Sequence, residues 1–196
     1  MKTTTYTKTP YPPGDFGIWI IIYIELLTFG LFFVGFAYSR RADIELFNSS
    51  QLLLDQRAGF VNTILLLTSS YFVVKSVESI KNLEIEKASK KAKNWLLAAM
   101  GLGGLFLIIK LMEFVGKYQE GINLSTNTFF MFYFLLTMFH FLHVVLGMII
   151  LFNLYQKTKI GGYTATDHRG LVTGASYWHM VDLLWIVLFP LIYIMR

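Results

Sequence analysis

The chain contains no cysteine and few charged residues for its length. The absence of cysteine excludes disulfide bonds, iron–sulfur clusters, thiolate zinc sites and the binuclear copper site that requires bridging thiolates. Only 15% of the 196 residues are charged and 55% are hydrophobic, whereas about a quarter of a soluble domain is charged. The composition therefore indicates an integral membrane protein with little mass outside the bilayer.

Histidine is also scarce, because the chain has only four, and one of them, His168, lies in a predicted loop. A bundle that binds haem through paired histidines takes them from different helices, so this number leaves little room for such a site. The net charge of +5 comes largely from lysines beside apolar blocks, where basic residues orient membrane spans. We therefore expect no haem or metal ion bound by this chain, and no nucleic-acid partner.

Five apolar blocks are long enough to cross a bilayer, since about 20 helical residues at 1.5 Å each suffice. They predict an all-α fold, with residues 16–196 forming a single bundle of five transmembrane helices. The proline-containing tail 1–15 is expected to be extended, 42–57 to be a loop, and the charged stretch 81–94 to continue the helices into water. The predicted spans are Phe16–Tyr38, Ala58–Ile80, Trp95–Val115, Thr128–Tyr155 and Val172–Met195.

Basic residues are distributed unequally between the two ends of this predicted bundle. Ten lie on the side of the N-terminus and five on the other side, which by the positive-inside rule predicts a cytoplasmic N-terminus and tail. The first group is Lys2, Lys8, Lys81, Lys87, Lys90, Lys91, Lys93, Lys157, Lys159 and Arg169. The second group is Arg40, Arg41, Arg57, Lys117 and Arg196.

Ionisable side chains near the middle of the spans are the candidate functional residues, because burying them without a partner is costly. Five such residues, named below, fall within about two helical turns of mid-membrane. Their common depth predicts one polar layer in which Glu25 meets histidines of the fourth and fifth spans. Nearer the outer surface, Lys110 and Glu113 are three residues apart and predict a polar pair. The mid-membrane residues are Glu25, His140, His143, His179 and Asp182.

This layer has more than one interpretation. Its residues either form a packing network or exchange protons near neutral pH, and Glu25 is the strongest candidate for exchange because its span holds no other ionisable residue. A small proton or ion conductor is therefore an alternative function. A metalloenzyme site is a third, since His140 and His143 are spaced to bind a metal together with Glu25 or Asp182, although carboxylate-rich metal motifs are missing.

The last two spans carry motifs that identify a family. YWHMVDLLWIVLF near the C-terminus and FHFLHVVLG at 139–147 resemble the last and penultimate helices of subunit III of the haem–copper oxidases. The Asn62-Thr63 pair, LMEF around Glu113 and IELLTFGLFF around Glu25 follow the same order along the chain. The short five-span form and the segment TNTFFMFYFLLT resemble the NorE-type branch that accompanies nitric oxide reductase.

The resemblance implies an accessory, non-catalytic subunit of a respiratory complex in the bacterial inner (plasma) membrane. It implies that haem, with copper or non-haem iron, belongs to a catalytic partner, which is a nitric oxide reductase or a cytochrome c oxidase. It places Glu25 at the position of a carbodiimide-reactive carboxyl that contacts a histidine of a later helix, here His140 or His143. Phospholipid is the further ligand that it implies.

Overall fold

The computed structural model describes residues 14–82 and 85–195, and these residues form helices without any strand. Five of the helices are long and apolar enough to cross a membrane, which confirms the predicted all-α membrane bundle. The expected extended tail lies almost entirely outside the described residues. The helices are α1 (Phe16–Ala42), α2 (Ile44–Gln51), α3 (Gln56–Asn82), α4 (Ile85–Gln119), α5 (Thr128–Lys159), α6 (Arg169–Phe189) and the π-helical turn η1 (Pro190–Ile194).

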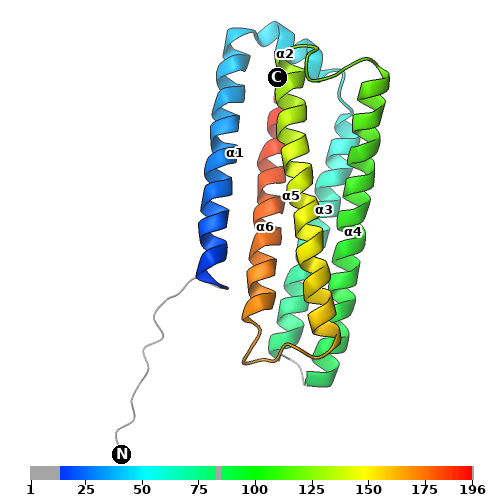
Figure 1. The fold of residues 1–196 in the computed structure, drawn as a ribbon. Helices are drawn as coiled ribbons and strands as arrows, with labels where there is room; N and C mark the ends of the chain where they lie inside the picture. Colours follow the sequence, from blue (N-terminus) through cyan, green and yellow to red (C-terminus); the bar gives the residue numbers. More distant parts are fainter. Residues whose placement is uncertain (1–13, 83–84, 196) are drawn as a thin grey trace, which may run out of the picture.

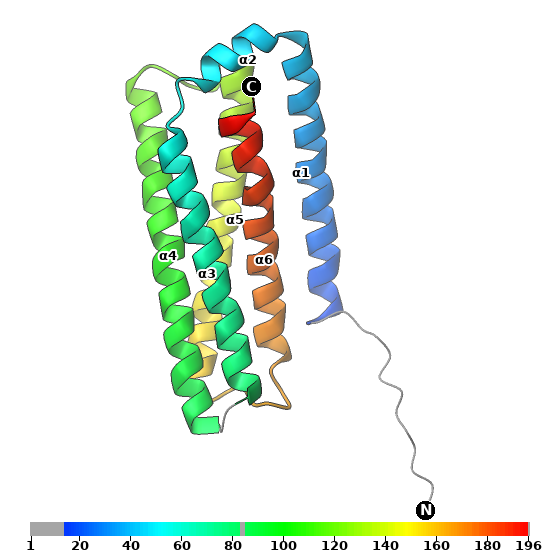
Figure 2. The same cartoon turned by 180° about the vertical axis from the view of Figure 1, so that it is seen from behind.

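Four long helices form the centre of the bundle, and the fifth lies on its flank. Helices α3, α4, α5 and α6 pack in a closed ring, while α1 packs along the outside of α5 and α6 (Figure 1). The same arrangement seen from behind shows α3 and α4 side by side and α1 at the far edge (Figure 2). Burial follows this division, since 61% of the most apolar stretch of α6 is buried but only 17% of that of α1.

The segment 42–57 contains helix α2, so the expectation of a loop there was wrong. Asp43 caps this helix by accepting a hydrogen bond from the backbone N–H of Leu46 at 3.1 Å, which satisfies one of the free donors of the first turn. Phe47 of α2 is 2% exposed, and its ring lies 5.2 Å from that of Phe36 and 5.6 Å from that of Phe129. Burial of this one aromatic residue therefore holds a short polar helix across the end of the bundle.

The last helix changes geometry at Pro190, where the π-helical turn begins. The backbone N–H of Met195 donates to the carbonyl of Pro190 at 2.9 Å, the five-residue spacing of a π-helix. Two glutamine side chains complete this turn: Gln51 donates to the Ile192 carbonyl at 2.8 Å, and Gln56 donates to the Tyr193 carbonyl at 2.7 Å. The turn is thus fixed to the segment that joins α2 and α3.

Trp178 of α6 fills a slot between two glycines on neighbouring helices. It is 1% exposed. A Cβ atom added to Gly147 of α5 would lie 2.8 Å from its ring, and one added to Gly103 of α4 would lie 2.9 Å from it. Real Cβ atoms do not come so close to another heavy atom, so these two positions need glycine for the indole to reach the bundle axis.

Candidate functional site

The structure brings Glu25 of α1 to His143 of α5, one of the contacts expected from the sequence. The Nε2 atom of His143 lies 3.0 Å from Oε2 of Glu25. The two side chains are 10% and 24% exposed, so the pair lies at the edge of the bundle rather than on its axis. It joins the flanking helix α1 to the central ring.

The hydrogen bonds of His143 determine how many protons the pair holds. Its Nδ1 atom donates to the Phe139 carbonyl at 2.7 Å, so only Nε2 faces Glu25. A single proton between Nε2 and the carboxyl satisfies both groups, either as a neutral pair or as an imidazolium with a carboxylate. Without that proton two acceptors face each other, and with a second proton two donors do. One proton between Nε2 and the carboxyl is therefore the arrangement that satisfies this contact.

His179 and Asp182 lie in a separate place, between α6 and α3. Nδ1 of His179 lies 3.6 Å from Oδ2 of Asp182 and is hydrogen-bonded to the hydroxyl of Ser70 on α3. The predicted i,i+3 pair therefore does form, but it faces Ser70 rather than Glu25. The single layer expected from the sequence is divided into clusters on different sides of α6.

His140 makes no polar contact among the described residues, although it is fully buried. Its ring lies 5.2 Å from that of Trp185 and 5.9 Å from that of Phe106. Between His140 and His143 lies Phe29, whose ring is 6.5 Å from the first and 5.5 Å from the second. The two histidines thus share a helix face, yet only His143 reaches the carboxyl of Glu25.

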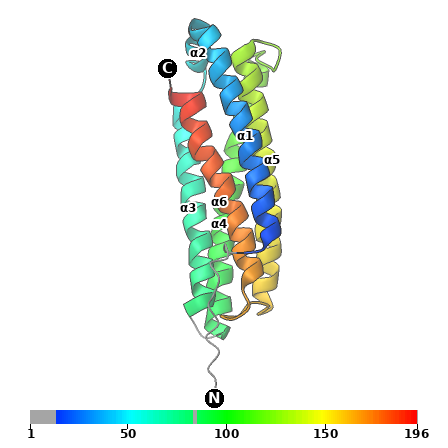
Figure 3. The same cartoon turned by 90° about the vertical axis from the view of Figure 1, so that its left-hand side faces the viewer.

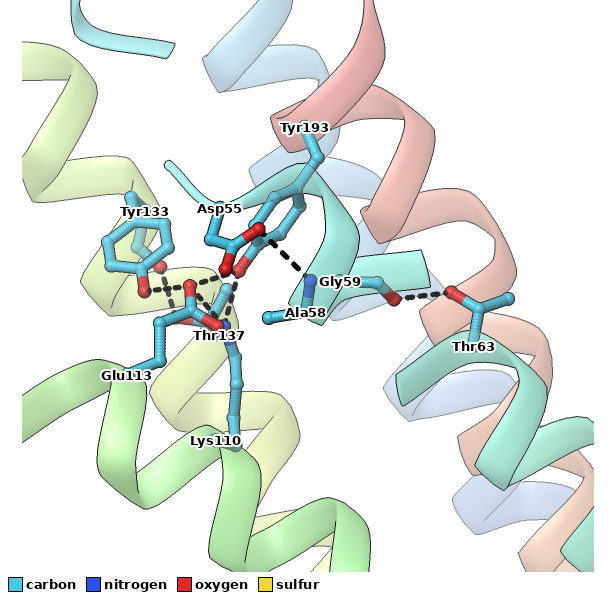
Figure 4. Close-up of polar contacts among 9 residues, drawn as sticks. All are labelled: Asp55, Ala58, Gly59, Thr63, Lys110, Glu113, Tyr133, Thr137 and Tyr193. Carbon is cyan, nitrogen blue, oxygen red and sulfur yellow. Dashed lines mark hydrogen bonds and ion pairs between the residues drawn. The ribbon is translucent and has the colours of Figure 1, made fainter. Parts of the chain in front are cut away.

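The largest polar cluster, here called the Lys110 cluster, consists of Lys110, Glu113, Tyr133 and Tyr193 (Figure 4). Nζ of Lys110 lies 3.1 Å from Oε1 of Glu113, so the predicted pair forms an ion pair. Tyr133 donates to the same oxygen at 2.6 Å, and Tyr193 also donates to it. Lys110 donates to the Tyr193 hydroxyl as well. One carboxylate oxygen therefore receives three donors from three helical elements.

Aromatic rings enclose the ammonium group of Lys110, whose side chain is fully buried. The nitrogen lies 5.1 Å from the ring centres of Phe114, Tyr133 and Tyr193, and 5.5 Å from that of Trp185. Such rings attract a cation through their electron-rich faces. The ion pair and the rings together compensate the loss of water around the charge.

Glycine also makes room for this cluster. A Cβ atom on Gly59 of α3 would lie 2.8 Å from the ring of Phe189 and 3.2 Å from that of Tyr193. In Figure 4, Gly59 and Ala58 pass beside the Tyr193 ring, and the backbone N–H of Ala58 donates to Asp55 at 3.2 Å. The close packing of Gly59 and the hydrogen bond from Gln56 to the Tyr193 carbonyl hold the N-terminus of α3 next to η1, which positions Tyr193.

Sequence reasoning did not identify Tyr133, Tyr193 or Ser70 as members of these clusters. Tyr133 lies in an aromatic run whose pattern indicates packing against lipid and other helices. Tyr193 is 80 residues from Glu113 in the chain. The available signal was the buried lysine itself, since a charge at that depth requires more donors and acceptors than one neighbour supplies. Among residues 14–82 and 85–195, no group of three His, Asp or Glu side chains is placed to hold a metal ion.

Comparisons of the sequence with known proteins identify relatives of this chain. A family profile described as cytochrome c oxidase subunit III matches residues 14–196. Cytochrome c oxidase subunit 3 of Synechocystis sp. is 33% identical over 136 residues, which is 69% of this chain and 55% of that protein. Its counterpart from Thermostichus vulcanus is 33% identical over 136 residues, covering 69% of this chain and 64% of that protein.

A quinol oxidase subunit matches over a greater length. Cytochrome bo(3) ubiquinol oxidase subunit 3 of Buchnera aphidicola is 27% identical over 202 residues, which covers 98% of this chain and 92% of that protein. The present chain therefore aligns with little more than half to two thirds of the two cytochrome c oxidase subunits, but with nearly all of the quinol oxidase subunit.

Proposed function

The chain belongs to the subunit III family of the haem–copper oxidases, and from this premise we propose that it is a non-catalytic accessory subunit of a respiratory complex. One observation carries the proposal: the family profile covers the whole described bundle, from residue 14 to its last residues. The proposed partner is a catalytic subunit that carries haem, with copper or non-haem iron. The chain would support electron transfer by that partner in the bacterial inner membrane.

The first candidate partner is a nitric oxide reductase, and the second is a cytochrome c oxidase. The short five-helix form and the segments TNTFFMFYFLLT and YWHMVDLLWIVLF support the first candidate through their resemblance to the branch that accompanies nitric oxide reductase. The names of the curated relatives support an oxidase in general. Membrane phospholipid is the further ligand we propose for this chain.

Within this function, we assign to the Glu25–His143 pair the role of a proton-exchanging group at the bundle surface. Its support is the one-proton geometry of the pair and its partial exposure. The Lys110 cluster has the opposite character, because its carboxylate oxygen already receives three donors and its lysine is fully buried. We assign to it the role of fixing η1 and α3 against α4 and α5.

Affinity purification of the tagged chain from its own membranes in a mild detergent tests the proposal. We expect a haem-bearing protein to co-purify in stoichiometric amount and the separated chain to show no haem absorption. Nitric oxide and oxygen consumption by the co-purified complex then identify which catalytic partner is present. Haem or a metal ion retained in stoichiometric amount by the separated chain would contradict a non-catalytic role.

A further inference from the structure

A groove lies between α1 and α6, the flanking helix and the ring helix that run side by side in Figure 3. The cavity has a volume of about 330 Å³. Its walls are apolar except at His179 and Ser176. The wall residues used in the argument below are Trp19, Ile22, Leu26, His179, Met180 and Leu183.

His179 presents one ring nitrogen to this groove. Its Nδ1 atom is taken by the Ser70 hydroxyl and by Asp182, while Nε2 has no polar contact among the described residues. The side chain of His179 is 39% exposed, whereas that of Asp182 is only 11% exposed. Asp182 and Ser70 therefore both contact the Nδ1 side of the ring, and this orientation leaves Nε2 as the nitrogen that faces the groove.

The depth of His179 determines what can satisfy that nitrogen. It lies ten residues after Arg169, the first residue of α6, which corresponds to about 15 Å along the helix. That is about half the thickness of the hydrocarbon core. Water and phospholipid head groups do not reach this level. An acyl chain in the groove would leave Nε2 without a hydrogen-bond donor, which is unfavourable in an apolar medium.

We propose that this groove binds a neutral, membrane-soluble quinol, with one ring hydroxyl donating to Nε2 of His179. When Nδ1–H donates to the Ser70 hydroxyl, with the Asp182 carboxylate 3.6 Å away, Nε2 is an acceptor, so the ligand must supply the donor. No Asp, Glu, Lys or Arg lines the cavity and an imidazole that accepts at Nε2 is neutral, which matches an uncharged ring with an apolar tail. The cavity volume lies at the lower end of the range for small-molecule sites, about 300–1,000 Å³.

The ligand's ring would lie between the apolar side chains of the two helices. Ile22 and Leu26 are one turn apart on α1, and Met180 and Leu183 flank His179 on α6. This places the hydroxyl at one wall and leaves the open side of the groove for a tail directed into the lipid. The proposal concerns binding only, and it does not depend on which catalytic subunit is the partner.

Titration calorimetry on the full chain in lipid nanodiscs tests this site, with a short-chain ubiquinol, its dimethyl ether and empty nanodiscs as the blank. The ether has the same ring but no hydroxyl donor. We expect saturable binding of the quinol and an affinity about threefold to tenfold lower for the ether, the effect of one hydrogen bond. Equal affinities, or heat no greater than in empty nanodiscs, would overturn the proposal.

The variant His179→Leu tests the protein side of the same contact, because it removes the acceptor and puts an apolar side chain in its place. In that variant the quinol and the ether should bind equally weakly. The matched control is His168→Leu, at the loop end of α6 and outside the groove, which should bind like the wild type. Retention of the quinol preference in His179→Leu would contradict the proposed contact.

The same titration on the complex with its haem-bearing partner decides between a ligand and a protein neighbour. Binding that persists in the complex supports a quinol site. Binding that disappears when the catalytic subunit is present would mean that a helix of that subunit covers the groove, and the proposal would then be wrong.

Discussion

The central ring and the flanking helix α1 each contain a buried or partly buried acidic residue beside a basic one, but the two pairs are built differently. Lys110 and Glu113 are 0% and 7% exposed and are surrounded by tyrosine donors and aromatic rings. His143 and Glu25 are 10% and 24% exposed, and among the described residues each is the other's side-chain partner in an ion pair. A polar pair on the axis is therefore enclosed by its surroundings, while the pair on the flank remains open to exchange.

The two pairs also differ in what the loss of one partner leaves behind. Removing Lys110 would strand a carboxylate in the protein interior, where no solvent can replace the ammonium group. Removing His143 would leave Glu25 at the edge of the bundle, where its side chain is 24% exposed and is not enclosed by the protein. The comparison thus predicts a large effect on stability in the ring and a small one on the flank.

The largest effect is expected for Lys110→Met. Removing one partner of a buried ion pair costs about 3–5 kcal/mol. Tyr133 and Tyr193 donate to the same Glu113 oxygen as Lys110, so the substitution also disturbs their hydrogen bonds. We expect the free energy of unfolding, measured by SDS titration in mixed micelles, to fall by about that amount. His143→Leu, which breaks the flanking pair, should lower it by about 1 kcal/mol or less, as interhelical polar contacts in membranes do.

The double variant Lys110→Met with Glu113→Gln is the control for this result. It removes both charges, so it should recover much of the stability that Lys110→Met loses. If His143→Leu proves as destabilising as Lys110→Met, the distinction between ring and flank fails.

A second effect of intermediate size is expected from added volume. In Gly147→Val the first new carbon would lie 2.8 Å from the Trp178 ring, so the indole must move out of its slot. Overpacking of this kind costs about 1–3 kcal/mol. On α1, Gly30 has no atom within 4 Å of an added Cβ, so Gly30→Val is the matched control.

Thermal unfolding followed by circular dichroism in detergent compares the two glycine variants directly. Gly147→Val should unfold at a clearly lower temperature than the wild type, and Gly30→Val close to it. A similar loss in both would indicate that α1 is packed as tightly as the ring.

The sequence could predict the features of this structure that depend on residues close together along one helix. The five spans follow from the length and composition of the apolar blocks, and the Lys110–Glu113 and His179–Asp182 pairs follow from helical spacing, because both depend on neighbours along one helix. Helix α2 was missed because its stability comes from one buried ring, Phe47, in a polar segment.

Contacts between helices were predicted less completely. Depth alone placed Glu25 beside a histidine, and His143 is there. Depth does not fix rotation about the helix axis, so it could not show that His143, rather than His140 or His179, reaches Glu25. Tyr193 reaches Glu113 through the π-helical turn at Pro190, and no spacing rule for regular helices contains that geometry.

The smallest effect on stability, and the sharpest chemical contrast, is expected at Glu25. Glu25→Gln keeps the shape of the side chain and a hydrogen bond to Nε2 of His143, so the free energy of unfolding should change by only about 0.6 kcal/mol, the average for such contacts in membranes.

A hydrophobic carbodiimide, in contrast, needs a protonated carboxyl that it can reach from the lipid. The role proposed above provides this at Glu25, because that carboxyl would share a proton with His143 and is 24% exposed. Glu113 does not provide it, because three donors hold its Oε1 atom and its side chain is 7% exposed. Peptide mapping by mass spectrometry after carbodiimide treatment should therefore find the adduct on Glu25 and not on Glu113. An adduct on Glu113 with Glu25 unmodified would reverse the assignment of the open and the enclosed pair.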